Sequence, residues 1–312
     1  MNLYSYIKKA KNLFWLNCLK RNGFILPNLY LSNINISELK TVKKILFFFA
    51  DEEYMHLGDH LFFIPLIQVF MTAGFVVEVA PTRVMQPLLQ NLGFTIFNIR
   101  QSLSDYDLII SRIEMIDLFP THRALLVNVS KNLSMPICDQ LLNDFGKFFY
   151  LPEYKKIDYM MFYFGDILDK LKLPKNKKIV LFSLFCDASA FMVNKTKVNY
   201  LLRFAREYAE KNDCILVLVG TTQDKIAQPI DCEYIDLRGK TTVLDIFSLV
   251  GSNNVICYIG FDAFVMHVFS LFCKSSFVVF RGRLFKHKHE MLKKYHVNLF
   301  CTDNYVHLLD VK

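Results

Sequence analysis

The sequence lacks any C-x-x-C pair, although it contains eight cysteines. They are Cys18, Cys138, Cys186, Cys214, Cys232, Cys257, Cys273 and Cys301. Most of them stand in apolar stretches, where a thiol behaves as a small hydrophobic side chain. The spacing therefore favours free thiols in a reducing compartment.

Long hydrophobic runs are also absent. The longest stretch without Asp, Glu, Lys or Arg spans residues 60–77, and His60, Pro65, Gln68 and Gly74 interrupt it. A membrane-spanning helix needs about 20 mainly apolar residues, so we expect a buried helix and a turn here. The N-terminus has positive charge but neither an uninterrupted apolar segment nor a small-residue cleavage site, which argues against a secretory signal. We therefore expect a cytoplasmic protein.

Two glycine-rich phosphate-binding motifs are missing. None of the 11 glycines forms a G-x-G arrangement, so the dinucleotide-binding fingerprint is absent. The segment Gly239-Lys240-Thr241 resembles the end of a Walker A loop, but Tyr234 occupies the position of its first glycine. This disfavours a P-loop NTPase.

Hydrophobic residues and positively charged residues are abundant. Of the 312 residues, 53% are hydrophobic and 21% are charged, which excludes a disordered or fibrous chain. The formal charge is +8 and the pI is about 8.9, so an anionic partner is favoured. Charge alone leaves open a nucleotide, a phospholipid surface, a phosphorylated glycan or nucleic acid.

Apolar segments alternate between strand-like and helix-like patterns along most of the chain. Strands are expected at 43–50, 75–80, 95–99, 106–111, 177–185, 214–220, 254–260 and 275–280, with helices after Gly58-Asp59 and at 83–93, 159–173, 197–213, 244–253 and from about Asp262. This alternation predicts an α/β fold with two Rossmann-like domains whose parallel sheets face a central cleft. We place the domains at residues 43–165 and 166–312.

Residues 1–42 stand outside this alternation. Leu3, Tyr6, Ile7 and Ala10 fall on one helical face, and lysines lie largely beside it. Such a basic amphipathic extension suits an anionic membrane surface. Packing against the rest of the protein is the alternative that we favour, because folded domains bury such stripes routinely.

The segment 236–280 carries an ordered set of motifs. Asp236, Leu237, Gly239, Lys240 and Thr241 form a D-L-x-G-K-T loop, and Asp262 and His267 keep the spacing of a D-[ST]-G-x-x-H turn that opens a helix. Near the first strand, Gly58, Asp59 and Pro65 match a G-D-x-x-x-x-x-P element. Together these motifs resemble the heptosyltransferases, glycosyltransferase family 9, from about residue 43 to the end.

The resemblance implies a GT-B fold and an inverting, metal-independent transfer of a heptose from ADP-heptose to the lipopolysaccharide inner core. Residues 43–165 would then face the acceptor, and residues 166–312 would bind the nucleotide sugar. Asp59 is our candidate base, because a carboxylate within reach of the acceptor hydroxyl can take its proton. The structural alternative for Asp59 is a helix cap, which accepts backbone N–H bonds.

The resemblance also places the donor in the second domain. The pyrophosphate would meet backbone amides at Ala263 and Phe264, and Asp262 would touch the sugar. Lys195 would supply a charge, although a solvated loop lysine is an equal alternative. Three further donor-binding candidates each have a structural alternative. Asp224 would reach the ribose hydroxyls, although a simple loop carboxylate is favoured, and Lys240 would organise its loop or the nucleotide pocket. For His267 a buried core histidine is favoured over a ligand contact.

Ala263 and Phe264 depart from the family pattern, which has Ser or Thr followed by Gly. We therefore expect a reshaped donor pocket, and two alternatives remain open: another nucleotide sugar such as a hexose donor, or a noncatalytic scaffold with the same fold. His287, His289 and Glu290 lie among lysines, so we read them as a solvated basic face and expect no metal and no cofactor. The expected partners are a nucleotide sugar, a lipid-linked phosphorylated glycan and the anionic inner face of the cytoplasmic membrane. No nucleic-acid recognition module is present in the sequence.

Overall fold

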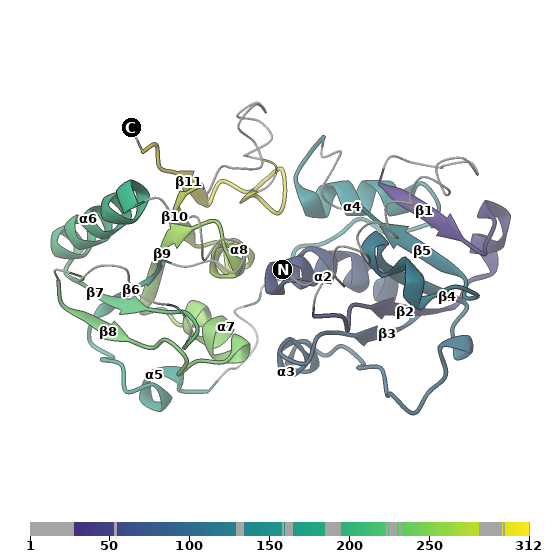
Figure 1. The fold of residues 1–312 in the computed structure, drawn as a ribbon, viewed down its shortest axis with the longest axis horizontal. Coiled ribbons are helices and arrows are strands. Elements are labelled where there is room, and N and C mark those ends of the chain that lie inside the picture. The colour runs from purple at the N-terminus through teal and green to yellow at the C-terminus, as the bar shows by residue number, and fades with distance from the viewer. Residues whose placement is uncertain are drawn as a thin grey trace, which may run out of the picture. The chain divides into compact units, whose positions relative to one another are not determined.

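The computed structural model describes residues 28–52, 55–128, 134–157, 159, 165–184, 195–222, 224, 230, 232–280, 295 and 297–311. The chain divides into two compact units, Met1–Lys155 and Lys156–Lys312, which are described separately below. The first unit ends at Lys155, ahead of the boundary at residue 165 that the sequence suggested. Each unit contains one sheet with helices packed against it (Figure 1).

The first unit has a five-stranded sheet in the order β1-β5-β4-β2-β3. Its strands are β1 (Leu29–Ser32), β2 (Lys44–Phe48), β3 (Val76–Ala80), β4 (Leu108–Arg112) and β5 (Ala124–Val127). Strands β2 to β5 are parallel, while β1 runs antiparallel to β5 at the edge. The parallel strands are mainly apolar, as expected for strands that are buried on both faces.

Among its described residues, the first unit contains the α-helices α2 (Leu57–Thr72), α3 (Gln86–Asn91) and α4 (Ile137–Gly146). Short 3-10 helices occupy Ile36–Thr41, Leu103–Asp105 and Ile113–Leu118. Helix α2 is apolar on nearly every side, because it packs against both the sheet and α4. Phe47 on β2 contacts Phe70 of α2, whereas the next residue, Phe48, contacts Phe119. This alternation places one aromatic ring on each face of the sheet.

The second unit has a six-stranded, fully parallel sheet in the order β11-β10-β9-β6-β7-β8. Its strands are β6 (Lys178–Ser183), β7 (Cys214–Leu218), β8 (Tyr234–Asp236), β9 (Val255–Phe261), β10 (Ser275–Val279) and β11 (Val306–Leu308). Its helices are α5 (Ile167–Lys170), α6 (Lys195–Asn212), α7 (Val243–Gly251) and α8 (Phe264–Leu271).

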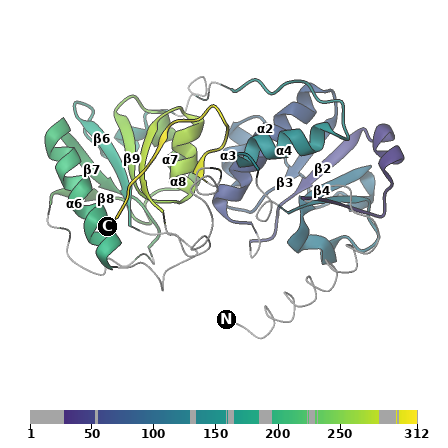
Figure 2. The same ribbon diagram turned by 90° about the horizontal axis from the view of Figure 1, so that it is seen from above.

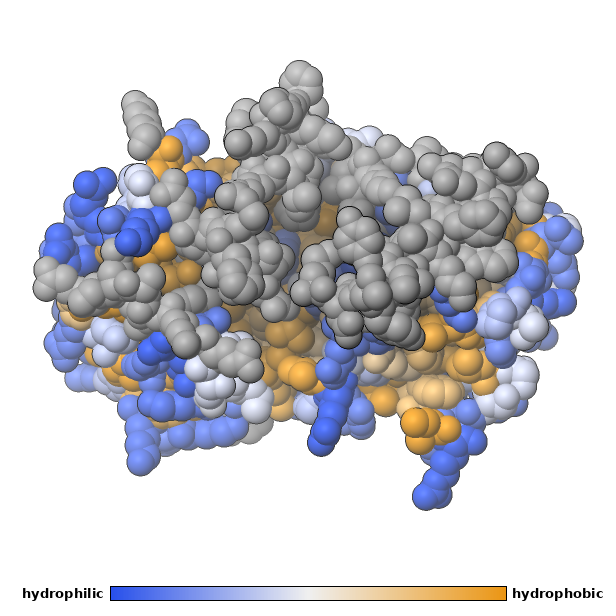
Figure 3. Space-filling view, viewed as in Figure 1, coloured by the Kyte–Doolittle hydropathy of each residue, from blue (hydrophilic) through white to orange (hydrophobic). Residues whose placement is uncertain are grey.

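Helices cover both faces of this second sheet, with α6 on one face and α7 and α8 on the other (Figure 2). Helix α6 buries Leu201, Ala205 and Ala209, which recur every four residues and pack against β6, β7 and β9. The surface at the position of α6 is mainly hydrophilic in Figure 3, as expected for the other side of an amphipathic helix. Among the described residues, no helix is long and apolar enough to span a membrane.

Three predictions about local structure need correction. Residues 29–32 of the expected N-terminal extension form an edge strand, because β5 offers an unpaired strand edge, and residues 36–41 form a 3-10 helix; residues 1–27 lie outside the described residues. The strand expected at 95–99 is reduced to a single bridge between Val79 and Ile96. The helix expected at 159–173 is present only as α5, and residues 160–164 lie outside the described residues.

Candidate functional site

Each sheet has a point where the chain reverses the direction in which it adds strands. In the first unit, β2 is followed by β3 on one side, and the chain then returns to place β4 on the other side of β2. In the second unit, β6 has β7 on one side and β9 on the other. Open parallel sheets bind ligands beyond the carboxyl ends of the strands at such points. A ligand site is therefore expected beyond β2 and β4 in the first unit and beyond β6 and β9 in the second.

Asp59 lies at this point of the first unit, as the third residue of α2, which follows β2. Its Oδ2 atom accepts a hydrogen bond from the backbone N–H of His56 at 3.2 Å, which caps the helix. The same Oδ2 atom accepts a hydrogen bond from Nη1 of Arg112, the last residue of β4. Within the part of the chain that the structure describes, Oδ1 of Asp59 accepts no hydrogen bond. Asp59 therefore caps α2 through Oδ2 and keeps Oδ1 open.

Arg112 joins Asp59 to Glu114. Its Nε and Nη2 atoms donate to the two carboxylate oxygens of Glu114 at 3.2 Å and 3.1 Å, in a fork-to-fork arrangement. The side chain of Arg112 is only 12% exposed. Burial acts to lower its pKa, but the charges of Asp59 and Glu114 outweigh burial and raise the pKa of Arg112. The guanidinium group therefore stays charged and keeps its protons, so Arg112 cannot act as a general acid.

His60 follows Asp59 and is fixed in a neutral form. Its Nδ1 lies 3.1 Å from the carbonyl oxygen of His56, and its Nε2 accepts the backbone N–H of Thr82 at 3.2 Å. Nδ1 is therefore assigned the proton. Burial lowers the pKa of His60 to about 4, the hydrogen bond to His56 opposes this, and the charge of Arg112 adds to it. Both ring nitrogens are occupied, so His60 is excluded as the base.

The second unit builds its corresponding point from backbone and buried groups. Asp262 directly follows β9 and is 6% exposed. Gly260, on the same strand, lies under the buried ring of Tyr258, whose hydroxyl donates to the carbonyl oxygen of Phe261 at 3.0 Å. A Cβ atom on Gly260 would lie 2.3 Å from the Tyr258 hydroxyl and 2.6 Å from the carbonyl oxygen of Ser183, the last residue of β6. Only glycine fits between β6 and this ring.

Helix α8 begins immediately beyond Asp262. Ala263 is its N-cap, in an extended conformation, and Phe264 is its first residue. Alanine has no side-chain oxygen to cap the helix, so the N-terminal amides have no help from the side chain at the cap position. His267 lies one turn further along and is 7% exposed, which agrees with the core histidine that the sequence favoured.

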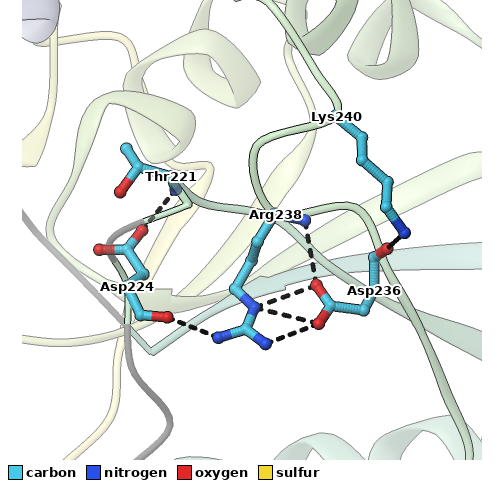
Figure 4. Close-up of polar contacts among 5 residues, drawn as sticks. All are labelled: Thr221, Asp224, Asp236, Arg238 and Lys240. Carbon is cyan, nitrogen blue, oxygen red and sulfur yellow. Dashed lines mark hydrogen bonds and ion pairs between the residues drawn. The ribbon is translucent and has the colours of Figure 1, made fainter.

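Arg238 joins two loops that follow β7 and β8, at one edge of the second sheet (Figure 4). Its Nη1 donates to the carbonyl oxygen of Asp224, after β7, and its Nε and Nη2 bind the carboxylate of Asp236, at the end of β8. The carboxylate of Asp224 accepts the backbone N–H of Thr221, and Nζ of Lys240 donates to the carbonyl oxygen of Asp236 at 2.8 Å. Arg238 lowers the pKa of Asp236 below its usual value, mainly through the hydrogen bonds that its side chain donates to the carboxylate.

These contacts give Asp224 and Lys240 structural roles within their loops. Gly239 belongs to the same group, because its φ of +66° suits glycine and a Cβ atom there would lie 2.1 Å from Cγ2 of Thr222. The next turn of the motif is also structural, since Thr242 and Asp245 form the capping box of α7. Most of the D-L-x-G-K-T motif thus shapes two adjoining loops.

Lys195 is the first residue of α6 and is exposed. The segment 185–194, which joins it to β6, lies outside the described residues, as do His287, His289 and Glu290. Among the residues that are described, no group of three or more His, Cys, Asp or Glu side chains is arranged to hold a metal ion.

The sequence predicted Asp59 and Asp262 but missed Arg112, Glu114, His60 and Arg238. A signal for Arg112 was available, since a basic residue follows the apolar strand expected at 106–111, two positions before an acidic one. Its pairing with Asp59 was not readable, because the two residues are 53 positions apart and meet only through the strand order.

No family model matches the sequence, and no curated protein matches it either. Solved structures do match. A glycosyl transferase family 9 protein from Veillonella parvula DSM 2008 is similar over 86% of this chain and 85% of its own, with a TM-score of 0.58 and 11% identity. The E. coli ADP-heptose lps heptosyltransferase II covers 76% of this chain and 84% of its own, with a TM-score of 0.52 and 12% identity.

These likenesses confirm the predicted fold class. At 11% and 12% identity they bear on architecture and not on chemistry. The two parallel-dominated sheets, each with helices packed against it, are the two Rossmann-like units of that architecture. The chain therefore has the GT-B fold and is similar in structure to a member of glycosyltransferase family 9.

Proposed function

We propose that this protein is an inverting, metal-independent glycosyltransferase in which Asp59 is the general base. The observation that carries the proposal is the carboxylate of Asp59, which is anchored through Oδ2 and open at Oδ1 where the first sheet changes direction. Oδ1 would take the proton of an acceptor hydroxyl as its oxygen attacks the anomeric carbon and the bond to the nucleoside diphosphate breaks.

The donor is a nucleotide sugar, and we favour ADP-heptose, held by the second unit. Without a metal ion, the charge of the departing diphosphate has to be met by backbone N–H groups and basic side chains. The first amides of α8, at Ala263 and Phe264, would supply the former and Lys195 the latter, while Asp262 would contact the sugar. Arg238 and Lys240 would keep the two neighbouring loops, including Asp224, in shape for the nucleotide.

The acceptor is a lipid-linked phosphorylated glycan, for which the lipopolysaccharide inner core is our leading candidate. The net charge of +8 suits both a phosphorylated acceptor and the anionic inner face of the cytoplasmic membrane. Peripheral binding there would place the enzyme where its acceptor is exposed.

A second candidate function keeps the fold and changes the sugar. Phe264 opens α8, where the family motif has a glycine. A bulky aromatic residue at that position would reduce the space next to the proposed diphosphate site. The protein would then transfer a hexose in place of a heptose, or it would act as a noncatalytic scaffold with the same fold.

Transfer assays with purified protein separate these possibilities. We expect release of ADP from ADP-heptose in the presence of a lipid-linked acceptor and detection of the heptosylated lipid by mass spectrometry. Turnover only with UDP-, GDP- or CMP-sugars would replace the donor. No transfer, together with no rise in melting temperature on adding ADP, UDP, GDP or CMP, would contradict an enzyme and favour the scaffold, because a ligand that binds the native state must stabilise it.

A further inference from the structure

Three charged side chains meet beyond the carboxyl ends of β2 and β4 in the first unit. They are Asp59, Arg112 and Glu114, with side-chain exposures of 21%, 12% and 30%. Their contacts form a chain, in which Glu114 binds one side of the guanidinium group and Asp59 binds the other. We call these residues the Glu-Arg-Asp chain.

We propose that Arg112 and Glu114 are positioning residues that fix the carboxylate of Asp59 with its Oδ1 atom directed to the acceptor hydroxyl. This inference rests on the proposed function, because it assigns the support of the same base. Neither residue exchanges a proton in the reaction. They act by setting the orientation of the carboxylate plane.

The two carboxylate oxygens of Asp59 have different surroundings. Oδ2 accepts two N–H groups from two different elements, one from the backbone of His56 ahead of α2 and one from Arg112 at the end of β4. Two donors on one oxygen define the rotation of the carboxylate about its last bond, which is otherwise broad for aspartate. The other oxygen has no hydrogen bond among the described residues. The carboxylate of Asp59 is therefore held through Oδ2, and Oδ1 is available to an acceptor hydroxyl.

Arg112 is oriented by its bonds to Glu114. A single ion pair leaves a long side chain with several rotamers, but the two bonds to Glu114 occupy Nε and Nη2 in the plane of the guanidinium group. Only Nη1 then points to Asp59. Glu114 thus determines which nitrogen of Arg112 faces the base.

The local sequence around Arg112 creates this geometry. Arg112 ends β4 and is the N-cap of the 3-10 helix Ile113–Leu118, so its backbone is extended while the next residues turn. Glu114 lies in the first turn of that helix, where a carboxylate is favoured by the helix dipole. The turn lets Arg112 contact Glu114, two residues further along the chain, while Arg112 also contacts Asp59 of α2.

An ion-pair network that only stabilises the fold is the alternative. Arg123 offers a matched control in the same unit, since its Nη2 binds Oε1 of Glu38 at 3.1 Å, with side-chain exposures of 48% and 36%. Arg123 precedes β5 and lies at the opposite end of the sheet from Arg112. It shares the Arg-Glu pairing but has no contact with Asp59.

The test is a double-mutant cycle on transfer by the full chain. We expect Arg112→Ala to lower kcat about 10²-fold with little change in the KM of the donor, the size of loss that a misplaced catalytic group causes. In the Asp59→Asn background, Arg112→Ala should cost nothing further, because it acts only through that carboxylate. Arg123→Ala should stay within about twofold of the unmodified protein, as expected for an exposed ion pair.

Two milder variants keep the test decisive if Arg112→Ala fails to fold. Arg112→Lys retains the charge but cannot span both carboxylates, and Glu114→Gln retains the shape while weakening the fork, so each should lose about tenfold in kcat. Wild-type kcat in both variants, or an equal loss from Arg112→Ala with and without Asp59, would overturn the positioning role while leaving the transferase intact. Absence of transfer by the unmodified protein would overturn the proposed function and this inference together.

Discussion

Both units contain parallel strands whose order reverses direction at one strand, but the residues beyond that strand differ between the two units. In the first unit the place beyond β2 and β4 carries charged side chains, with Asp59 paired to an arginine whose side chain is 12% exposed. In the second unit the place beyond β6 and β9 is built from a glycine under a tyrosine ring and the start of a helix whose cap has no polar side chain. Proton transfer requires a side chain, whereas a diphosphate can be held by backbone N–H groups. The difference therefore matches the division of labour that we propose.

The largest expected effect tests the side-chain half of this comparison. Asp59→Asn should lower kcat by roughly 10²- to 10⁴-fold, the usual contribution of a general base. The fold should be retained, because an asparagine oxygen can still accept the N–H groups of His56 and Arg112. Steady-state kinetics and circular dichroism check this result.

Asp262→Asn is the counterpart in the second unit. We expect it to raise the KM of the donor more than it lowers kcat, since Asp262 is proposed to contact the sugar. An equal loss of kcat in both variants would show that the second unit also works through side-chain chemistry, and the contrast between the units would then break.

The next effect concerns pH and His60. The pKa of this buried histidine is about 4 in the folded protein and 6.5 in an unfolded chain. As pH falls from 6.5 to 4, the unfolded chain takes up the proton first, so His60 reduces stability progressively, by up to about 3 kcal/mol. His60→Gln should flatten the fall in the free energy of unfolding between pH 7 and pH 4, measured by urea denaturation. The exposed His307→Gln should not.

A smaller effect tests the backbone half of the comparison. Gly260→Ala should lower the free energy of unfolding by about 1–3 kcal/mol, because the new methyl group overlaps the Tyr258 hydroxyl and the Ser183 carbonyl oxygen. Gly146→Ala is the control, since it lies at the end of α4 with no atom within 4 Å of the added Cβ, and it should be neutral or stabilising by about 0.5–1 kcal/mol. Equal stability of the two variants would contradict the tight contact between β6 and β9.

The smallest effect separates two basic residues of the loop pair. Arg238→Ala should cost about 1 kcal/mol, because it removes the only side chain seen to bridge Asp224 and Asp236 among the described residues. Lys240→Ala should change stability by less than about 0.5 kcal/mol, since this exposed side chain makes one bond to a backbone oxygen. Thermal melts with and without ADP measure both stability and any loss of nucleotide binding.

Prediction from the sequence succeeded where the signal is local. The apolar runs that became β2, β6 and β9 and the amphipathic pattern of α6 follow from neighbours within a few residues. It failed where an element depends on a distant partner. Strand β1 exists because it pairs with β5, and β8, only three residues long, pairs with β7 after a polar loop. Neither carries enough periodicity to be recognised alone.

The candidate site divides in the same way. Asp59 and Asp262 were identifiable because each belongs to a short motif that resembles the family pattern, Asp59 in the first turn of a helix and Asp262 directly after a strand. Arg112 was visible only as one basic residue among many. Its role depends on β4 lying beside β2, which the sequence does not encode in a readable form, since parallel strands buried on both faces are all alike in pattern.

The sequence by itself determined the alternating elements, the positive charge and the two acidic residues at strand-to-helix junctions, because these are properties of short stretches of chain. The tertiary structure alone decided which oxygen of Asp59 is anchored, that His60 is neutral, and that Arg238 joins two loops. Hydrogen bonds and burial arise between residues far apart in the chain, so they exist only after the strands have taken their order.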